Sequence, residues 1–411
     1  MNIIEKFKFK VLKYGFYNAI KTIITNRIMI FGDKAIYNLE KQILRNRNLE
    51  NIIIIESHND FDSNGGAFYN YLIKSGYNKK YKIVWFLWNF DNKPRDLPYN
   101  VECFSFYKLS IKKNYYMCIA KYFAVDDSST VKKAKEQQML VHLRHGAGGL
   151  KNVKGFTKIS ASVDYILGMS ESYAKIESEQ LSLEYPDKRL VFLGFPSHDL
   201  LFQDNKNEIK KVTNGIFNKI ILWMPTFRRG VNNRNDSNIE LPLGVPLIND
   251  LSDYKKLNYL LKINKMFLII KIHPMQDLNT LKLLNLSNIN ILTGDIVKKL
   301  GIDNFRLMSC CDAMISDYSG AAYDFLQLNR PIAYVLSDMD EYKLGFVVED
   351  IHSLIAGHEI YKYEDMVQFL NDVSCENDMY RKKREKIRNY IYKYHDGDNS
   401  KRLVSLMRLE K

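Results

Sequence analysis

The stretch from Asp303 to Val335 most constrains the fold, because helical and strand patterns alternate along it without a gap. A helical apolar face is followed by a short apolar strand at Ala313–Ile315, and Ser316–Gly320 forms a tight turn. A second helix is expected at Ala321–Leu328, and a second strand at Ile332–Val335. Strands that alternate with helices in this way predict an α/β fold with a parallel sheet.

The turn of this stretch has the composition of a ligand-binding loop. Ser319 and Gly320 stand where the second helix begins, and a helix start presents unpaired N–H groups and a positive dipole end, which suit a phosphate. A plainer interpretation is that Asp317 and Ser319 only cap the helix. The pattern alone leaves both interpretations open.

Length and charge bound the class of protein. The chain has 411 residues, which suggests about two domains, and its net charge of +13 favours an anionic partner unless it reflects a general Lys-rich composition. No apolar run is long enough for a transmembrane helix, and no signal peptide is expected. Five cysteines without metal-ligand spacing suggest reduced thiols in the cytoplasm.

Residues 1–45 are expected to form a basic amphipathic helical segment. Residues 1–27 contain six Lys or Arg residues and a single acidic residue, Glu5, and their apolar residues recur at roughly helical spacing. Such a helix can lie on an anionic membrane surface. It can equally pack on the body of the protein with a solvated basic face, and the sequence does not separate the two.

A first domain is expected over residues 46–205. Residues 51–55 and 82–88 read as strands on either side of a polar loop and a helix, which is a βαβ unit, and Asn64 belongs to that loop. A later strand, residues 140–144, runs directly into His145 and Gly146, where three glycines follow within four residues. A His beside such a flexible loop can accept a proton near neutral pH. The adjacent carboxylates Asp126 and Asp127 lack the alternate spacing of a metal site, so no metal is expected.

A second domain is expected over residues 215–385, after a polar linker at 201–218 and before a helical tail at 386–411. Thr226 and Arg228 follow its first strand, His273 follows the next, and the Asp317–Gly320 turn follows a third. Loops at the carboxyl ends of parallel strands meet at one edge of a sheet. These three loops are therefore predicted to converge on one site for an anionic ligand, where Arg can donate bidentately to a phosphate.

Taken together, the motifs resemble the CDP-glycerol glycerophosphotransferases of teichoic acid and capsule synthesis. The resemblance covers nearly the whole chain beyond the amino-terminal helix, and the matching segments follow the order of the family. They are Ile52–Leu72, His145-Gly146, Gly194–Asp199, Met224–Arg228, Lys271–Pro274, Ser316–Gly320 with Asp324, Asp338–Tyr342 and Asp396-Gly397.

This resemblance implies a GT-B-like fold, with two Rossmann-like domains facing a central cleft. It implies that an acceptor hydroxyl attacks the distal phosphorus of a CDP-linked polyol phosphate and that CMP leaves. His145, in the His145-Gly146 motif, matches the residue expected to act as the base. His273, in the Lys271–Pro274 motif, matches the second catalytic residue. The donor would be bound by Thr226, Arg228, Asp317, Tyr318, Ser319 and Gly320, with Asn64 and Gly146 in an acceptor-side or structural loop. No cofactor is implied.

The implied partners are a CDP-linked polyol donor, a lipid-linked or saccharide acceptor, and an anionic membrane surface. The protein would lie in the cytoplasm, peripherally on the inner face of the cell membrane. No nucleic acid is expected as a partner. The chain departs from the family most in the loop after His145, which is one residue longer, and at Gly320, which replaces a Ser. Two alternatives stay open from the sequence. One is a GT-B glycosyltransferase that uses a nucleotide-sugar for capsular polysaccharide, and the other is a non-catalytic scaffold of envelope assembly.

Overall fold

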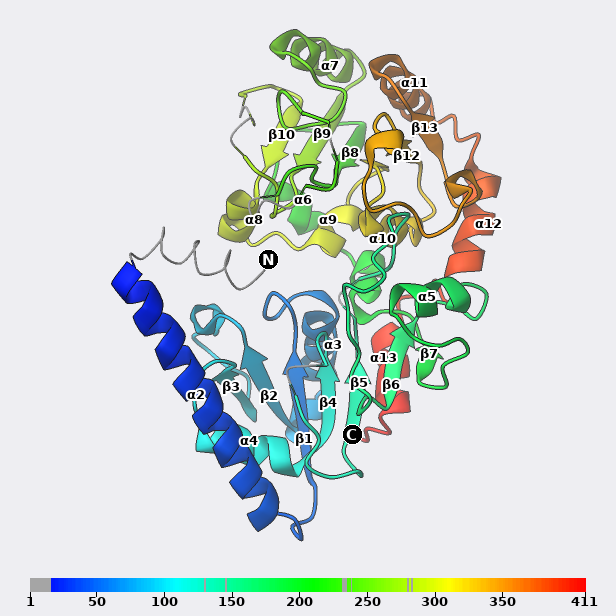
Figure 1. The fold of residues 1–411 in the computed structure, drawn as a ribbon. Coiled ribbons are helices and arrows are strands. Elements are labelled where there is room, and N and C mark those ends of the chain that lie inside the picture. The colour runs from blue at the N-terminus through cyan, green and yellow to red at the C-terminus, as the bar shows by residue number, and fades with distance from the viewer. Residues whose placement is uncertain are drawn as a thin grey trace. The chain divides into compact units, whose positions relative to one another are not determined.

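The computed structural model describes residues 16–128, 131–144, 146–230, 235–237, 239–278, 281 and 284–411, with side chains described from residue 29 onward. Contacts between Cα atoms divide the chain into two compact units. The first holds residues 1–145, 158–167 and 400–411, and the second holds 146–157 and 168–399. Each unit is built on a parallel sheet (Figure 1), which confirms the predicted α/β class.

The first sheet has seven strands in the order β3-β2-β1-β4-β5-β6-β7. An interior strand, β1, carries Ile52–Ile55, and each of these four side chains is at most 2% exposed. Such a continuous apolar run is typical of a parallel strand that is covered on both faces. The elements up to β7 are α2 (Phe16–Ile43), β1 (Glu50–Glu56), α3 (Ser63–Lys74), β2 (Lys82–Leu87), β3 (Val101–Ser105), α4 (Ile111–Ile119), β4 (Ala120–Val125), β5 (Met139–His142), β6 (Tyr165–Gly168), α5 (Ala174–Gln180) and β7 (Leu190–Phe192), with short 3₁₀ helices at Tyr77–Lys79 and Phe90–Asn92.

The loop after β1 is shorter than the sequence predicted. The helix α3 begins at Ser63, because the side chain of Asp62 accepts the Ser63 N–H and caps it. Asn64, Gly65 and Gly66, expected in the loop, are therefore the first buried residues of the helix. Gly65 is needed there, since a Cβ at this position would lie 2.9 Å from the Cβ of Ser57.

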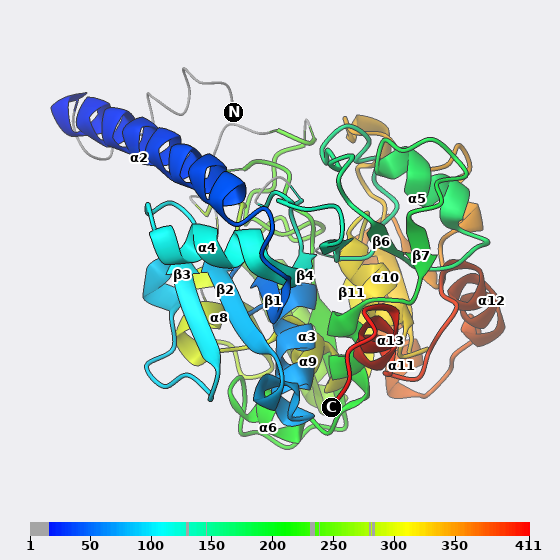
Figure 2. The ribbon, with the colours of Figure 1, turned by 90° about the horizontal axis from the view of Figure 1, so that it is seen from below.

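The long helix α2 lies alongside α4 in the first unit, as Figures 1 and 2 both show. Asp33 pairs with Lys113 at 2.8 Å and accepts the Asn114 amide at 2.9 Å. The Tyr37 hydroxyl donates to the backbone carbonyl of Lys132 at 3.2 Å. The described part of α2 is thus held by polar contacts to the body of the protein, while residues 1–15 lie outside the described residues.

The second sheet has six strands in the order β10-β9-β8-β11-β12-β13. Alternate residues of its strands, such as Ile221 and Trp223 of β8, form one core with buried side chains of α7 and α11. The elements after β7 are α6 (Lys206–Lys210), β8 (Lys219–Trp223), α7 (Leu251–Ile263), β9 (Met266–Lys271), β10 (Ile289–Leu292), α8 (Gly294–Leu300), α9 (Asn304–Ser309), β11 (Ala313–Ser316), α10 (Gly320–Leu326), β12 (Ile332–Val335), β13 (His358–Ile360), α11 (Tyr363–Ser374), α12 (Arg381–Ile391) and α13 (Asn399–Leu406), with 3₁₀ helices at Pro196–Phe202, Met339–Glu341 and Ile351–Ser353.

The polar stretch 201–218, expected to link two domains, lies within the second unit and contains α6. Its polar side chains bond to the region of α9. Asn205 accepts a bond from Arg306 and donates one to Ser309, at 2.9 and 2.8 Å, and Glu208 accepts the Asp303 N–H at 2.7 Å. The contact division consequently falls earlier in the chain than the expected boundary near residue 210, and residues 400–411 belong to the first unit.

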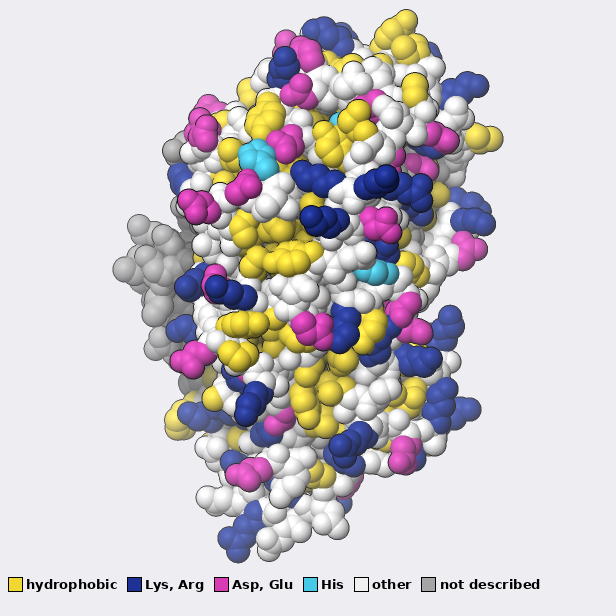
Figure 3. Space-filling view, turned by 90° about the vertical axis from the view of Figure 1, so that its right-hand side faces the viewer, with side chains coloured by type: hydrophobic (Ala, Val, Ile, Leu, Met, Phe, Trp, Pro, Cys, Tyr) yellow, Lys and Arg dark blue, Asp and Glu magenta, His cyan; other side chains and the backbone are white. Residues whose placement is uncertain are grey.

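The basic run of the carboxyl-terminal region forms α12, whose Arg381, Lys382 and Lys383 are exposed while Arg384 is buried. Figure 3 views the molecule from the side on which α12 lies in Figure 1, and its Lys and Arg side chains are interspersed with Asp and Glu. Among the described helices, none is both long and apolar enough to cross a bilayer.

Candidate functional site

Three loops of the second unit meet at the carboxyl edge of its sheet. They follow β9, β8 and β11, which are neighbours in the strand order. The chain turns to opposite sides of β8 to form β9 and β11, so this edge is the switch point at which open parallel sheets bind ligands. The predicted convergence of the Thr226, His273 and Asp317 loops is therefore what the strand order produces.

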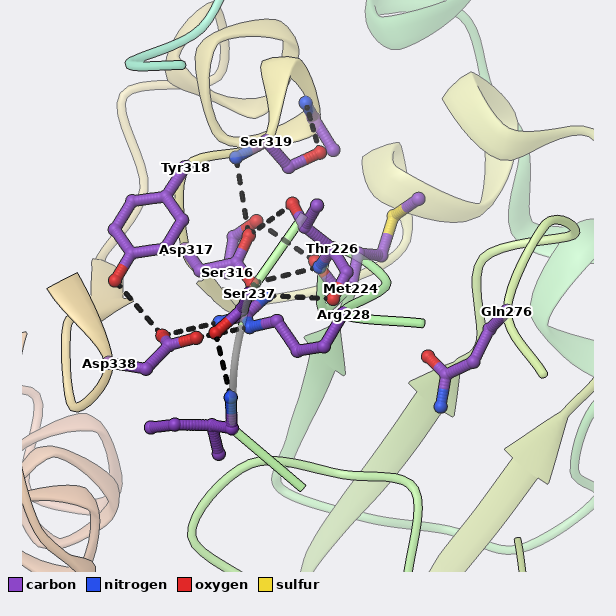
Figure 4. A network of polar contacts seen from close by, with 12 residues as sticks. Met224, Thr226, Arg228, Ser237, Gln276, Ser316, Asp317, Tyr318, Ser319 and Asp338 are labelled. Atoms are coloured by element: carbon purple, nitrogen blue, oxygen red, sulfur yellow. Dashed lines mark hydrogen bonds and ion pairs between the residues drawn. The ribbon is translucent and has the colours of Figure 1, made fainter. Parts of the chain in front are cut away.

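The Asp317 carboxylate ties two of these loops together (Figure 4). One oxygen accepts the Thr226 hydroxyl at 2.6 Å and the Ser319 N–H at 3.2 Å. The other accepts the Thr226 N–H and the Arg228 guanidinium, each at 2.8 Å. Asp317 is 1% exposed, so a buried charge is satisfied by four donors.

Arg228 lies between two carboxylates and is also 1% exposed. It donates from Nε and Nη2 to Asp338 at 2.6 and 2.8 Å, and from Nη1 to Asp317 and to the Thr226 carbonyl. Burial by itself lowers the pKa of Arg228, but the two carboxylates outweigh it and hold the pKa above its ordinary value. The guanidinium thus stays charged and fixed.

Tyr318 completes this buried network. Its hydroxyl donates to Asp338 at 3.0 Å, and its ring lies 5.4 Å from the Arg228 guanidinium carbon. Burial, followed by the charge of Asp338, raises the pKa of Tyr318, so the hydroxyl remains a donor. Thr226, Arg228, Asp317 and Tyr318 are all brought together as predicted, but all of these hydrogen bonds are made within the protein.

The remaining predicted donor-binding residues are more open. Ser319 and Gly320 are half-buried, and Ser319 is the N-cap of α10, where its hydroxyl accepts the Ala321 N–H at 3.3 Å. The capping interpretation of Ser319 is therefore confirmed.

The glycine-rich loop 146–151 packs against this turn in the second unit. A Cβ on Gly149 would lie 2.7 Å from the Gly320 nitrogen, and one on Gly320 would lie 2.8 Å from the Ala147 oxygen. The Lys151 N–H donates to the Tyr318 carbonyl at 3.3 Å. From the sequence, this loop was expected to belong to the first domain. In the structure it belongs to the second unit, because the backbone at Gly149 contacts the backbone at Gly320.

His273 follows β9 and is half-buried, with its ring 4.9 Å from the ring of Phe227. Its Nδ1 lies 3.0 Å from the Met275 nitrogen and accepts that N–H. The neutral ring therefore carries its hydrogen on Nε2, which makes Nε2 a hydrogen-bond donor. A donor at this edge of the sheet suits a phosphate oxygen.

In the first unit, Asn64 holds the segment that precedes His145. Its amide nitrogen donates to the carbonyls of Leu143 and Arg144 at 3.0 and 2.8 Å, and the side chain is fully buried. Arg144 has a φ of 60°, an uncommon conformation for a residue with a side chain. His145 itself lies outside the described residues, and a Cβ on Gly146 would have no atom within 4 Å.

A pair of buried acids occupies the switch point of the first sheet, between β1 and β4. Glu56 accepts the N–H groups of Asp126 and Asp127 at 3.1 and 3.0 Å, and also the Trp88 indole. Burial raises the pKa of Glu56 to about 7. Burial, followed by the charge of Glu56, also raises the pKa of Asp126.

Sequence reasoning gave no role to Asp338 or Glu56. Asp338 lies in one of the motif segments that resemble the family, and it pairs with an Arg 110 residues earlier. Glu56 ends an apolar strand, and a carboxylate at the end of a buried strand is the signal that marks it.

Comparison with known proteins decides the family. Residues 39–409 match the model of the family described as CDP-Glycerol:Poly(glycerophosphate) glycerophosphotransferase. The chain belongs to this family. It is therefore a transferase of the predicted class, and the resemblance inferred from its motifs is confirmed.

The relatives of this family member include enzymes with several teichoic acid roles. The chain is 27% identical over 320 residues to a teichoic acid glycerol-phosphate primase of Bacillus subtilis (strain 168), covering 72% of this chain and 76% of the relative. It is 22% identical to the teichoic acid ribitol-phosphate polymerase TarL of Staphylococcus aureus (strain NCTC 8325 / PS 47), covering 98% of this chain and 68% of the relative.

The family member also shares its fold with a solved enzyme. The wall teichoic acid polymerase TagF matches with a TM-score of 0.70 and 18% identity over 99% of this chain and 98% of that one. This likeness confirms the predicted GT-B-like fold.

Proposed function

We propose that this transferase moves a polyol phosphate, glycerol phosphate first of all, from a CDP-linked donor to an acceptor hydroxyl in teichoic acid synthesis. Family membership supports the reaction class. The observation that carries the site is the convergence of the β8, β9 and β11 loops at one sheet edge. The two alternatives drawn from sequence, a nucleotide-sugar glycosyltransferase and a scaffold, are not needed to explain the family match.

In the proposed step, the acceptor oxygen forms a bond to the phosphorus that carries the polyol. The bond from that phosphorus to the bridging oxygen breaks, and CMP leaves with the bridging oxygen. His145 takes the proton of the acceptor hydroxyl, and general-base catalysis of this kind contributes about 10²–10⁴-fold. Positioned donors and charges supply most of the remaining catalysis in such transfers.

The donor diphosphate would be contacted by His273 Nε2 and by the Ser319–Gly320 turn, which are only half-buried. We assign Thr226, Arg228, Asp317 and Tyr318 to positioning, because their donors are engaged with one another and with Asp338. Rigid loops held in this way cost little reorganisation during the reaction.

CMP release from CDP-glycerol and CDP-ribitol, each with an acceptor, tests the proposal. Wild type should release CMP, and His145→Ala should lose about 10²–10⁴-fold. His352→Ala, which removes a His that is half-exposed and paired with Glu359, serves as the matched control. Release no greater than that of His145→Ala with either donor would defeat the proposal.

The acceptor and the location are proposed from the charge of the amino-terminal segment. A lipid-linked acceptor and a peripheral place on the cytoplasmic face of the membrane fit the basic amino-terminal segment. Deletion of residues 1–27 should move the protein from the membrane fraction to the soluble fraction. An unchanged distribution would exclude this segment as the anchor.

A further inference from the structure

Two neighbouring cavities in the first unit share the side chain of Lys132. The first has a volume of about 220 Å³ and is lined mainly by apolar and aromatic residues of α2, α4 and the ends of β2 and β3. The second has a volume of about 450 Å³ and is lined mainly by lysines and serines. Because Lys132 lines both, the largely apolar cavity and the basic cavity are neighbours at this residue.

The apolar part of this cavity is walled by Ile30 and Tyr37 of α2, Phe86 at the end of β2, Phe106 after β3 and Met117 of α4. The polar residues of its lining are Asp33, Lys34, Lys113, Asn114 and Lys132. Beside this cavity, α2 is tethered to α4 by the polar contacts of Asp33. An engineered apolar cavity of about 150 Å³ is large enough to bind benzene. This cavity therefore has room for a segment of hydrocarbon chain.

The basic cavity has the donor set of a phosphate site. Lys132, Lys133 and Lys158 line it together with the hydroxyls of Ser128, Ser160 and Ser162, and no carboxylate is among its lining residues. Lys133 is paired with Asp164 at 2.8 Å. Neither Lys132 nor Lys158 has a carboxylate partner within the described residues. Two uncompensated ammonium groups match the charge of a phosphate dianion.

We propose that these two neighbouring cavities together bind an amphiphile, with its phosphate among Lys132, Lys158 and the serines and its hydrocarbon chain in the cavity beside α2. The charge of one cavity and the apolar lining of the other both favour this ligand over a free sugar or a free fatty chain. That the amphiphile is the acceptor rests on the proposed function. Its binding does not, and it can be measured separately.

Calorimetry with the full-length protein tests the binding, using decyl phosphate below its micelle concentration, decanol and inorganic phosphate. Decyl phosphate should bind at least tenfold more tightly than either part. A double variant, Lys132→Glu with Lys158→Glu, should weaken decyl phosphate at least tenfold. Ile30→Glu, at a rim position that is 55% exposed, should weaken decyl phosphate and leave inorganic phosphate unchanged.

Lys121→Glu is the matched control, because Lys121 is an exposed lysine near the start of β4, whereas Ser128 of the cavity follows the end of that strand. Equal binding of decyl phosphate to wild type and to both cavity variants would overturn the proposal. So would decanol or inorganic phosphate binding as tightly as decyl phosphate. If CMP is released with a soluble acceptor while decyl phosphate does not bind, this inference fails and the proposed function stands.

Discussion

Gly149 and Gly320 meet backbone to backbone, so that a methyl group on Gly149 would lie 2.7 Å from the nitrogen of Gly320. Real side chains essentially never approach so closely, and here the neighbouring atoms belong to a backbone that cannot rotate away. The loop that follows His145 and the turn that begins α10 are thus matched in shape. This contact gives the first prediction.

Gly149→Ala should separate the loop from the turn. Overpacking of this kind costs about 1–3 kcal/mol of stability. We expect a lower urea midpoint together with a fall in the rate of CMP release. Gly146→Ala is the control, since nothing lies within 4 Å of a Cβ there, and it should unfold like wild type. Equal midpoints for both variants would show that the contact does not bear on stability.

Arg228→Met should leave Asp317 and Asp338 buried without their cation. Removal of one partner of a buried pair costs about 3–5 kcal/mol. Arg229→Met is a neighbouring control, because Arg229 forms an exposed pair with Glu240 and such pairs contribute about 0–1 kcal/mol. Chemical denaturation of the two variants measures the difference. A loss below about 1 kcal/mol for Arg228→Met would contradict the structural role assigned to it.

Asn64→Ala should remove both hydrogen bonds to the segment before His145. Leaving buried carbonyls unsatisfied costs about 1–3 kcal/mol. If this segment positions the base, kcat should fall with little change in the KM for the CDP-linked donor. Asn59→Ala, at an exposed Asn near the same helix start, should retain the wild-type kcat. A stable Asn64→Ala enzyme with the wild-type kcat would remove the positioning role.

Glu56 should make stability depend on pH. Its pKa is about 7 in the folded protein and 4.5 ordinarily, so between these values the folded state binds more protons than the unfolded state. Stability is then lost as pH rises through this window. Glu56→Gln lacks the titration, so from pH 5 to pH 8 it should gain about 1–3 kcal/mol relative to wild type.

The free energy of unfolding of both proteins, measured across that range, tests this expectation. The comparison is a difference between two pH values, so any constant cost of replacing the carboxylate cancels. Glu136→Gln, at an exposed acid of the same unit, should follow wild type. A constant offset between Glu56→Gln and wild type at every pH would refute it.

Local pattern was enough to predict much of this fold. The segment that runs through β11, α10 and β12 was predicted because its apolar periods are short, regular and separated by turn residues. Ile332–Val335 was predicted with its observed bounds. The convergence of three loops was also predicted, because each of them follows a strand of one parallel sheet.

Local pattern could not predict the hydrogen bonds and ion pairs between distant parts of the chain. The polarity of residues 201–218 suggested a solvated linker, but Asn205 and Glu208 bond to α9 about 100 residues later. Arg228 was expected to face a phosphate, because its charge is visible in the sequence whereas its two partner carboxylates are not. A polar sequence indicates that its side chains need hydrogen-bonding partners, but it does not identify those partners.

The carboxyl-terminal segment carries a practical consequence for engineering. Leu403 and Met407 of the last dozen residues are fully buried, and the Glu410 N–H donates to the Tyr81 hydroxyl at 3.1 Å in the unit that contains β1. A protein truncated after residue 399 would lack the final helix, would expose the apolar surface that the helix covers, and would be expected to aggregate. An affinity tag should therefore be attached after Lys411 through a flexible linker, and it should not replace the final helix.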